Sequence, residues 1–337
     1  MITAIGQSPQ PDGLPDWRQN LRDAITDARE LLALVGLPQL AETLPVGGEA
    51  GFPLKVPRGF VARMRHGDPH DPLLLQVLPQ LVELDHTQGF GDDAVGDLDA
   101  VAAHGVLHKY EGRALLIAAG SCAVNCRYCF RRHFPYAEEL AAAHAWREAI
   151  DCLAKDTSIR EVILSGGDPL VLSTQKLTDF TNALCGLPHV IRLRIHSPLP
   201  VVLPERIDGT FCGWLSALSL QRVVVLHANH PNELDASVGA ACARLREAGA
   251  TLLNQSVLLR GVNDQAGTLL ELSERLFALG VLPYYLHQLD RVRGAAHFEV
   301  PDARARELVG TLRARLPGYL VPRLVREVPG ENAKRPL

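Results

Sequence analysis

Three cysteines lie close together in the segment GSCAVNCRYCFRRHF, with the spacing Cys122-x3-Cys126-x2-Cys129. A short loop with three thiolates can hold a metal centre, because thiolate sulfur is a preferred ligand of zinc and of iron–sulfur clusters. A structural zinc site needs a fourth ligand, for which His133 is the nearby candidate. A four-iron, four-sulfur cluster can be held by three cysteines, which leaves one iron open. The spacing favours the cluster, and zinc or three unrelated thiols are the alternatives.

Six short apolar runs predict the strands that must position this loop. They begin near residues 114, 161, 191, 222, 251 and 281, and amphipathic segments such as 234–248 and 303–316 follow them. This alternation is typical of βαβ units around a parallel sheet buried on both faces. In such folds the carboxyl ends of the strands carry the chemistry, and here they lead into polar segments. Periodicity alone allows an open doubly wound sheet or a partial six-stranded barrel.

The residues before the first run have a different pattern. Helical spacing extends from Asp16 to Leu34, a proline-punctuated stretch covers 52–84, and 89–105 is rich in Gly and Asp, as connecting loops are. We therefore predict a helical N-terminal subdomain with its connector over 1–105. An α/β domain over 106–322 and a short C-terminal segment over 323–337 complete the predicted organisation.

Composition limits the class of protein. The chain has 337 residues, 47% of them hydrophobic, and 34 basic against 38 acidic residues, a net charge of −4. These values exclude a disordered chain, a collagen and a small disulfide scaffold. Mixed charges without a basic stripe give no sign of a nucleic-acid or membrane partner. Because neither a signal peptide nor a membrane span is evident, we expect a cytoplasmic protein with reduced thiols.

Several motifs together resemble one enzyme family. CxxxCxxC after the first strand of a six-unit α/β barrel is the signature of the radical S-adenosylmethionine (SAM) superfamily. CRYCFRR, SGGDP, HANHPNE, NQSVLLRGVND, PYYLHQLD, GAAHF and PGENAKRPL resemble the lysine 2,3-aminomutases, from Trp17 to Leu337. The resemblance implies a partial (β/α)6 TIM-like barrel and is greatest to the branch that makes (R)-β-lysine for elongation factor P.

The same resemblance implies three cofactors and the residues that bind them. Cys122, Cys126 and Cys129 would hold a [4Fe-4S] cluster whose open iron binds SAM. The SAM contacts would be Ser165, Gly166, Gly167, Asp168, His227 and Gln255. Read by themselves, the glycines could form a plain turn and His227 could be an ordinary core residue. Lys334 would be the catalytic lysine that carries pyridoxal 5′-phosphate (PLP).

Charge indicates how a lysine substrate would be selected. A buried ammonium group needs a carboxylate partner, and the resemblance offers Asp290 and Glu327. Arg131 matches the residue that binds the substrate carboxylate, for which a guanidinium is well shaped. Glu327 stands where many relatives have aspartate, and residues 331–333 replace most of the usual glycines before Lys334.

The resulting hypothesis is an isomerase that converts L-α-lysine to (R)-β-lysine for the modification of elongation factor P. The implied partners are L-lysine, an electron donor such as flavodoxin or ferredoxin, elongation factor P with its lysyl ligase, and a second copy in a homodimer. A metabolic aminomutase acting on lysine or another amino acid such as glutamate is the nearest alternative. A non-catalytic iron–sulfur scaffold is another, whereas an RNA-modifying enzyme lacks an evident basic patch.

Overall fold

The computed structural model describes residues 16–45, 51–137 and 146–337. The N-terminal residues from which we exclude a signal peptide lie outside these ranges. One ten-stranded sheet follows the order of the chain, so strands that are consecutive in sequence are also neighbours in the sheet. The strands are β1 (Val101–Ala103), β2 (Val106–Tyr110), β3 (Arg113–Ala119), β4 (Glu161–Gly166), β5 (Arg192–His196), β6 (Gln221–Leu226), β7 (Thr251–Val257), β8 (Leu282–His287), β9 (Arg323–Arg326) and β10 (Arg335–Pro336).

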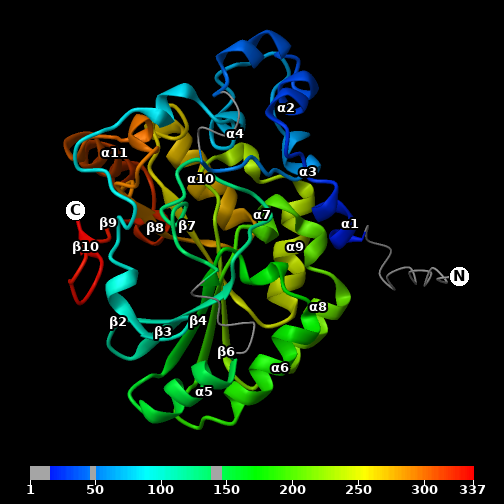
Figure 1. The fold of residues 1–337 in the computed structure, drawn as a ribbon, viewed down its shortest axis with the longest axis vertical. Helices are drawn as coiled ribbons and strands as arrows, with labels where there is room; N and C mark the ends of the chain where they lie inside the picture. Colours follow the sequence, from blue (N-terminus) through cyan, green and yellow to red (C-terminus); the bar gives the residue numbers. More distant parts are fainter. Residues whose placement is uncertain (1–15, 46–50, 138–145) are drawn as a thin grey trace, which may run out of the picture.

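The seven strands from β3 to β9 are parallel, whereas β1, β2 and β10 are antiparallel additions at the two ends of the sheet. A helix follows each strand from β3 to β8, and these helices cover the outside of the sheet (Figure 1). They are α5 (Trp146–Lys155), α6 (Thr174–Cys185), α7 (Leu199–Val202) with α8 (Gly209–Ala217), α9 (Ala236–Glu247), α10 (Ala266–Ala278) and α11 (Asp302–Arg315). The six predicted strands and the α/β class are confirmed as a partial, TIM-like (β/α)6 barrel.

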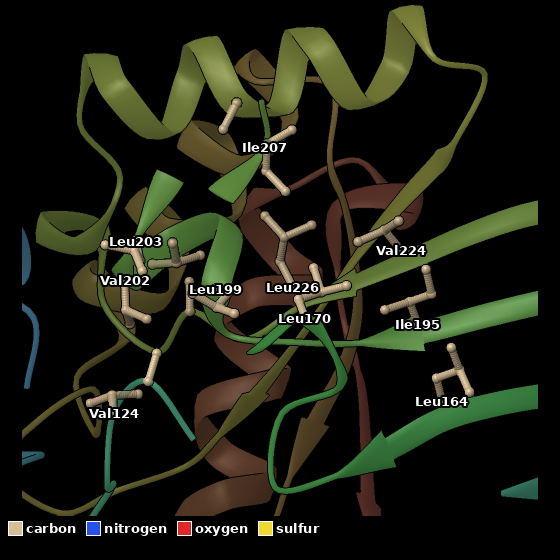
Figure 2. Packing of buried hydrophobic residues seen from close by; sticks show 14 of the residues in the cluster. Val124, Leu164, Leu170, Ile195, Leu199, Val202, Leu203, Ile207, Val224 and Leu226 are labelled. Carbon is tan, nitrogen blue, oxygen red and sulfur yellow. The ribbon is translucent and has the colours of Figure 1, made fainter. Parts of the chain in front are cut away.

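Side chains along each strand point alternately into the hydrophobic core under the helices and toward the inside of the barrel. Leu164, Ile195 and Val224 on β4, β5 and β6 lie side by side in Figure 2 and belong to the same buried hydrophobic cluster as Leu199 and Leu203. Neighbouring side chains on each strand point the other way, because successive residues of a strand face opposite sides of the sheet. Polar residues at these inward positions are therefore available to a ligand.

The N-terminal part of the chain packs as short helices, as predicted, but two details of the prediction are wrong. The helical pattern over 16–34 is two helices, α1 (Trp17–Arg22) and α2 (Ala28–Leu34), because Ile25 between them pairs with Val56 through backbone hydrogen bonds of 2.8 and 3.0 Å. The predicted connecting loop over 89–105 ends in strand β1.

Two further short helices, α3 (Arg58–Val61) and α4 (Pro72–Leu75), complete this region. Across the three described ranges, no helix combines the length and the apolar character that crossing a lipid bilayer would need. The domain boundaries at 105 and 322 stay a prediction.

Candidate active site

The carboxyl ends of the parallel strands surround a cavity of about 950 Å³. All of the site residues predicted from the sequence line this cavity except Asp168. Strand alternation places Ser165, His196, Gln255 and His287 on the inward face, and His227 follows directly after β6. The barrel thus gathers residues that lie more than 200 positions apart in the chain.

The three cysteines lie on the loop that follows β3, and all three are half-buried. Backbone hydrogen bonds anchor this loop: Asn125 donates to the Lys55 carbonyl at 2.9 Å and Arg127 to the Gln76 carbonyl at 2.8 Å. Burial, followed by the charges of neighbouring cysteines, raises the pKa of Cys126 to about 12 and that of Cys122 well above its usual value. Bound metal would be needed to hold these sulfurs as thiolates.

The geometry of the loop suits a cluster better than a single ion. Among the described residues, no group of three or more His, Cys, Asp or Glu side chains is arranged to hold one metal ion. His133, the fourth ligand of the zinc alternative, instead places Nε2 3.2 Å from the Arg293 carbonyl oxygen. In an iron–sulfur cluster each thiolate binds a different iron, so the sulfurs need not converge on one point.

A buried ionic group supports the cysteine loop from behind. Glu83 accepts hydrogen bonds from Nε of Arg127 at 2.9 Å and from Nη2 of Arg132 at 2.8 Å. Both guanidinium groups also lie over the Phe52 ring, with their central carbons 5.2 and 5.0 Å from its centroid. Burying one carboxylate with two cations is tolerable only when the hydrogen bonds are made, so this group fixes the loop. Sequence analysis missed Glu83, which lies in a segment without a recognisable motif.

Gly166 and Gly167 bring the end of β4 against the backbone of the cysteine loop. Gly166 has φ +112°, and a Cβ atom there would lie 2.7 Å from the Ala119 carbonyl oxygen. At Gly167 an added Cβ would lie 2.5 Å from the Ser121 carbonyl oxygen. The two segments are also joined by the Gly167 amide, which donates to the Ala119 carbonyl at 2.7 Å. Only glycine allows this approach, which leaves bare backbone beside the cavity.

Asp168 faces away from the cavity. Its Oδ1 atom accepts hydrogen bonds from the Leu170 amide at 2.9 Å and from the Ser197 hydroxyl at 2.7 Å. Burial raises the pKa of Asp168 to about 6. In this geometry Asp168 shapes the turn after β4 and does not line the ligand space.

A row of ion pairs and hydrogen bonds between side chains that line the cavity holds Arg131 in place. Its Nε atom donates to Asp97 at 2.6 Å, and its Nη1 atom donates to the Ser165 hydroxyl at 3.1 Å. The other oxygen of Asp97 lies 2.6 Å from the Lys109 ammonium, which in turn lies 3.4 Å from Glu327. Asp97 and Lys109 were missed by sequence analysis, since their partners are distant in the chain. Arg131 therefore has a fixed orientation beside the turn that follows β4.

This row of ion pairs ends at Lys334, the predicted PLP lysine. Lys334 forms an ion pair with Glu327, which also accepts a 2.8 Å hydrogen bond from the Tyr110 hydroxyl. Burial alone would raise the pKa of Glu327, but Lys334 and Lys109 lower it to about 2. Asp290, on the same cavity wall, has its pKa raised to about 7 by burial. An amine that faces the cavity beside two carboxylates can hold PLP and admit a cationic substrate.

The segment before Lys334 is ordered by its own side chains. Gly330 has φ +79°, the Glu331 amide donates to the Val328 carbonyl at 3.2 Å, and Glu331 forms an ion pair with Arg335. Glu331 thus fastens the β9–β10 hairpin.

Three histidines form one side of the cavity. His227 places Nε2 3.0 Å from Nε2 of Gln255, and its ring lies 6.0 Å from that of His196. Burial lowers the pKa of His227 to about 4 and that of His287 to about 3. Burial also lowers the pKa of His196 well below its usual value, so all three imidazoles are neutral at pH 7. Sequence analysis selected His227 but neither His196 nor His287 as a site residue.

Comparison with known proteins agrees with this site. A family model described as a 4Fe-4S single cluster domain matches residues 110–185, which contain the cysteine loop. The chain is 48% identical over 324 residues to the L-lysine 2,3-aminomutase of Escherichia coli, covering 96% of this chain and 94% of that protein. It is 34% identical to the L-lysine 2,3-aminomutase of Clostridium subterminale, covering 96% of this chain and 77% of that protein.

The solved structures that resemble the fold are more distant. A radical SAM methyltransferase from Sphaerobacter thermophilus superposes with a TM-score of 0.47 at 18% identity, over 66% of this chain and 68% of that one. The sequence relatives decide the assignment: this chain belongs to the L-lysine 2,3-aminomutase family of isomerases.

Proposed function

We propose that the protein is a PLP-dependent radical SAM aminomutase that converts L-α-lysine to (R)-β-lysine. Cys122, Cys126 and Cys129 would hold the [4Fe-4S] cluster, and Lys334 would hold PLP. Ser165, Gly166, Gly167, His227 and Gln255 would contact SAM, with Asp168 shaping the turn that carries the glycines. When bound, the cluster and SAM would supply hydrogen abstraction from an unactivated carbon. Bound PLP would supply a carbonyl that can carry nitrogen between adjacent carbons.

One observation carries this proposal: the cysteine loop and Lys334 line the same cavity. Radical chemistry on an amine requires both cofactors to reach one substrate, and a cavity of about 950 Å³ is of the size that ligand sites have. The protein itself would bind and orient the substrate and the cofactors and would exclude water. This role accounts for the lack of an obvious acid–base pair among the described residues.

The charged side chains suggest how L-lysine would lie in the cavity. The substrate carboxylate would bind Arg131, whose position Asp97 and Ser165 hold. The distal ammonium would lie between Asp290 and Glu327. In the ligand-free protein Glu327 is paired with Lys334. The Glu327 carboxylate becomes available to the substrate when the amine of Lys334 is bound to PLP. Two carboxylates at this end favour a cationic substrate over glutamate.

The test is an anaerobic assay of the reconstituted protein with SAM, PLP, a strong reductant and L-lysine, followed by chiral chromatography. We expect (R)-β-lysine from the wild type and none from Cys126→Ala or Lys334→Ala. The PLP absorbance band should also be lost in Lys334→Ala. A protein that holds all cofactors but forms no β-lysine contradicts the proposed substrate, and one that holds the cluster but binds neither SAM nor PLP supports the iron–sulfur scaffold.

We further propose that the β-lysine is used to modify elongation factor P through its lysyl ligase, in the cytoplasm. Support comes from the resemblance of the sequence motifs to the branch that makes (R)-β-lysine for elongation factor P. A flavodoxin or ferredoxin would supply the electron, and L-lysine, rather than a nucleic acid or a membrane, would be the ligand. We also propose that two copies of the chain form a homodimer. Deleting the gene and measuring the mass of elongation factor P tests the role, because loss of a β-lysyl adduct is expected.

A further inference from the structure

Two histidines in the cavity have a buried nitrogen that no described residue uses. His196 ends β5 and His287 ends β8, and the Nε2 atom of each is buried without a hydrogen-bond partner in the described part of the chain. By contrast, the Nε2 atom of His227 lies 3.0 Å from Gln255. A buried polar atom without a partner costs stability, so folded proteins rarely keep one without a functional reason.

Both imidazoles lie near the predicted PLP lysine. His287 pairs in the sheet with Val325 of β9, the strand that leads to Glu327 and Lys334. The positive charge of Lys334 adds to burial in lowering the pKa of both His196 and His287. A neutral imidazole can donate one hydrogen bond without adding a charge beside the lysine amine. The unused atoms are thus placed to meet a ligand with oxygen acceptors.

We propose that His196 and His287 donate hydrogen bonds from Nε2 to oxygen atoms of PLP held at Lys334. PLP carries phenolic and phosphate oxygens, which accept such bonds. This inference rests on the proposed function, because it requires PLP at that lysine. It assigns two binding residues in addition to the ionic contacts of the site.

The experiment compares two kinds of substitution in the full-length, cluster-reconstituted protein. His→Phe removes the nitrogen and keeps a ring, whereas His→Gln keeps a polar atom near the position of Nε2. PLP affinity is measured from the absorbance band that depends on Lys334, and thermal unfolding is measured without PLP. His189→Phe is the matched control, because His189 lies outside the cavity lining and places Nε2 3.0 Å from the Leu153 carbonyl.

We expect His196→Phe and His287→Phe to bind PLP about tenfold more weakly each. Their PLP-free unfolding temperature should be unchanged or higher, because an unpaired buried nitrogen has been removed. The Gln variants should stay within about threefold of wild-type affinity. His189→Phe should show the reverse, with normal PLP affinity and a lower unfolding temperature.

Wild-type PLP affinity in both Phe variants would overturn this inference alone. A lower unfolding temperature in the PLP-free variants, with equal losses for Phe and Gln, would overturn it by showing a structural role. Where a Phe variant does not fold, Gln is compared with Asn, whose shorter amide cannot reach the Nε2 position, and equal affinities contradict the proposal. A wild type without a Lys334-dependent band would refute the PLP site and this inference together.

Discussion

Tyr110 donates a 2.8 Å hydrogen bond from its hydroxyl to Oε1 of Glu327, and this contact joins the two ends of the open sheet. Tyr110 ends β2 near the first edge, whereas Glu327 follows β9 near the last. Figure 1 shows the red C-terminal hairpin on the same side of the molecule as the cyan β2. Within the described residues no backbone pairing links β1 to β10, so side chains hold this seam. The position of Lys334 depends on them.

Replacing Tyr110 by Phe should weaken the seam. A hydrogen bond to a charged acceptor contributes about 1.5–3 kcal/mol, and the variant should lose an amount in that range from the free energy of unfolding. Urea denaturation measures the loss. Tyr319→Phe is the control, because that side chain is 61% exposed and should change stability little. Equal stability of the two variants would show that the Tyr110 contact does not hold the seam.

Glu327→Gln should change how stability depends on pH. In the folded state the pKa of the Glu327 carboxyl is lowered from 4.5 to about 2. Its contribution to the free energy of unfolding is therefore fully present above pH 4.5 and is lost as the pH falls toward 2. The shift corresponds to roughly 3 kcal/mol at neutral pH. Denaturation at several pH values should therefore show a deficit for the variant at pH 7 that shrinks at pH 3. A deficit that is constant with pH would contradict the ionic role.

Asp97→Asn should affect substrate binding through Arg131. The variant keeps the shape of the side chain but removes the charge that fixes the guanidinium at 2.6 Å. We expect KM for L-lysine to rise by about five- to tenfold, with a change in kcat of less than about twofold. Asp92→Asn provides the control, since its ion pair with Arg293 is exposed. A fall in kcat at constant KM would argue against this positioning role.

Gly167→Ala should disturb the cysteine loop. The new methyl group would lie 2.5 Å from the Ser121 carbonyl oxygen, so one backbone segment must move, at a cost of about 1–3 kcal/mol. Iron and acid-labile sulfide content should fall in parallel. Gly213→Ala in α8 is the matched control, because no atom lies within 4 Å of its added Cβ and alanine favours helix. Full cluster content in Gly167→Ala would show that the loop can adapt.

Asp290→Asn should reduce the affinity for L-lysine. An unpaired ammonium in a buried site is costly, and losing one of two carboxylates should raise KM by at least about tenfold. Steady-state kinetics measure this effect, with Glu299→Gln as control because Glu299 pairs with Arg291 near the surface. Unchanged KM in Asp290→Asn would remove this residue from the substrate site.

The six central strands could be predicted because each is an apolar run bounded by turns. The outer strands could not. β9 has only four residues with an arginine at each end, and β2 ends in a Lys-Tyr pair. Such strands depend on the neighbours with which they pair, and local sequence does not record that pairing.

The same reason explains which site residues were found. The cysteines and Lys334 lie in recognisable motifs. Glu327 was found through the resemblance, but Lys109 lies 218 positions from it and, taken alone, would be expected on the surface as a charged residue. Their burial follows from the barrel, which brings the two ends of the sheet together. His196 and His287 follow the alternation of their strands, a signal that could have identified them.

The order of synthesis gives the C-terminal hairpin another meaning. Lys334 lies 205 positions after Cys129. At translation rates of about 5–20 residues per second, roughly 10–40 s separate their synthesis, and domains begin to fold from the N-terminal side. The cysteine loop therefore exists before the wall that carries the lysine. The three thiols are thus synthesised well before the hairpin that completes the lining of the cavity.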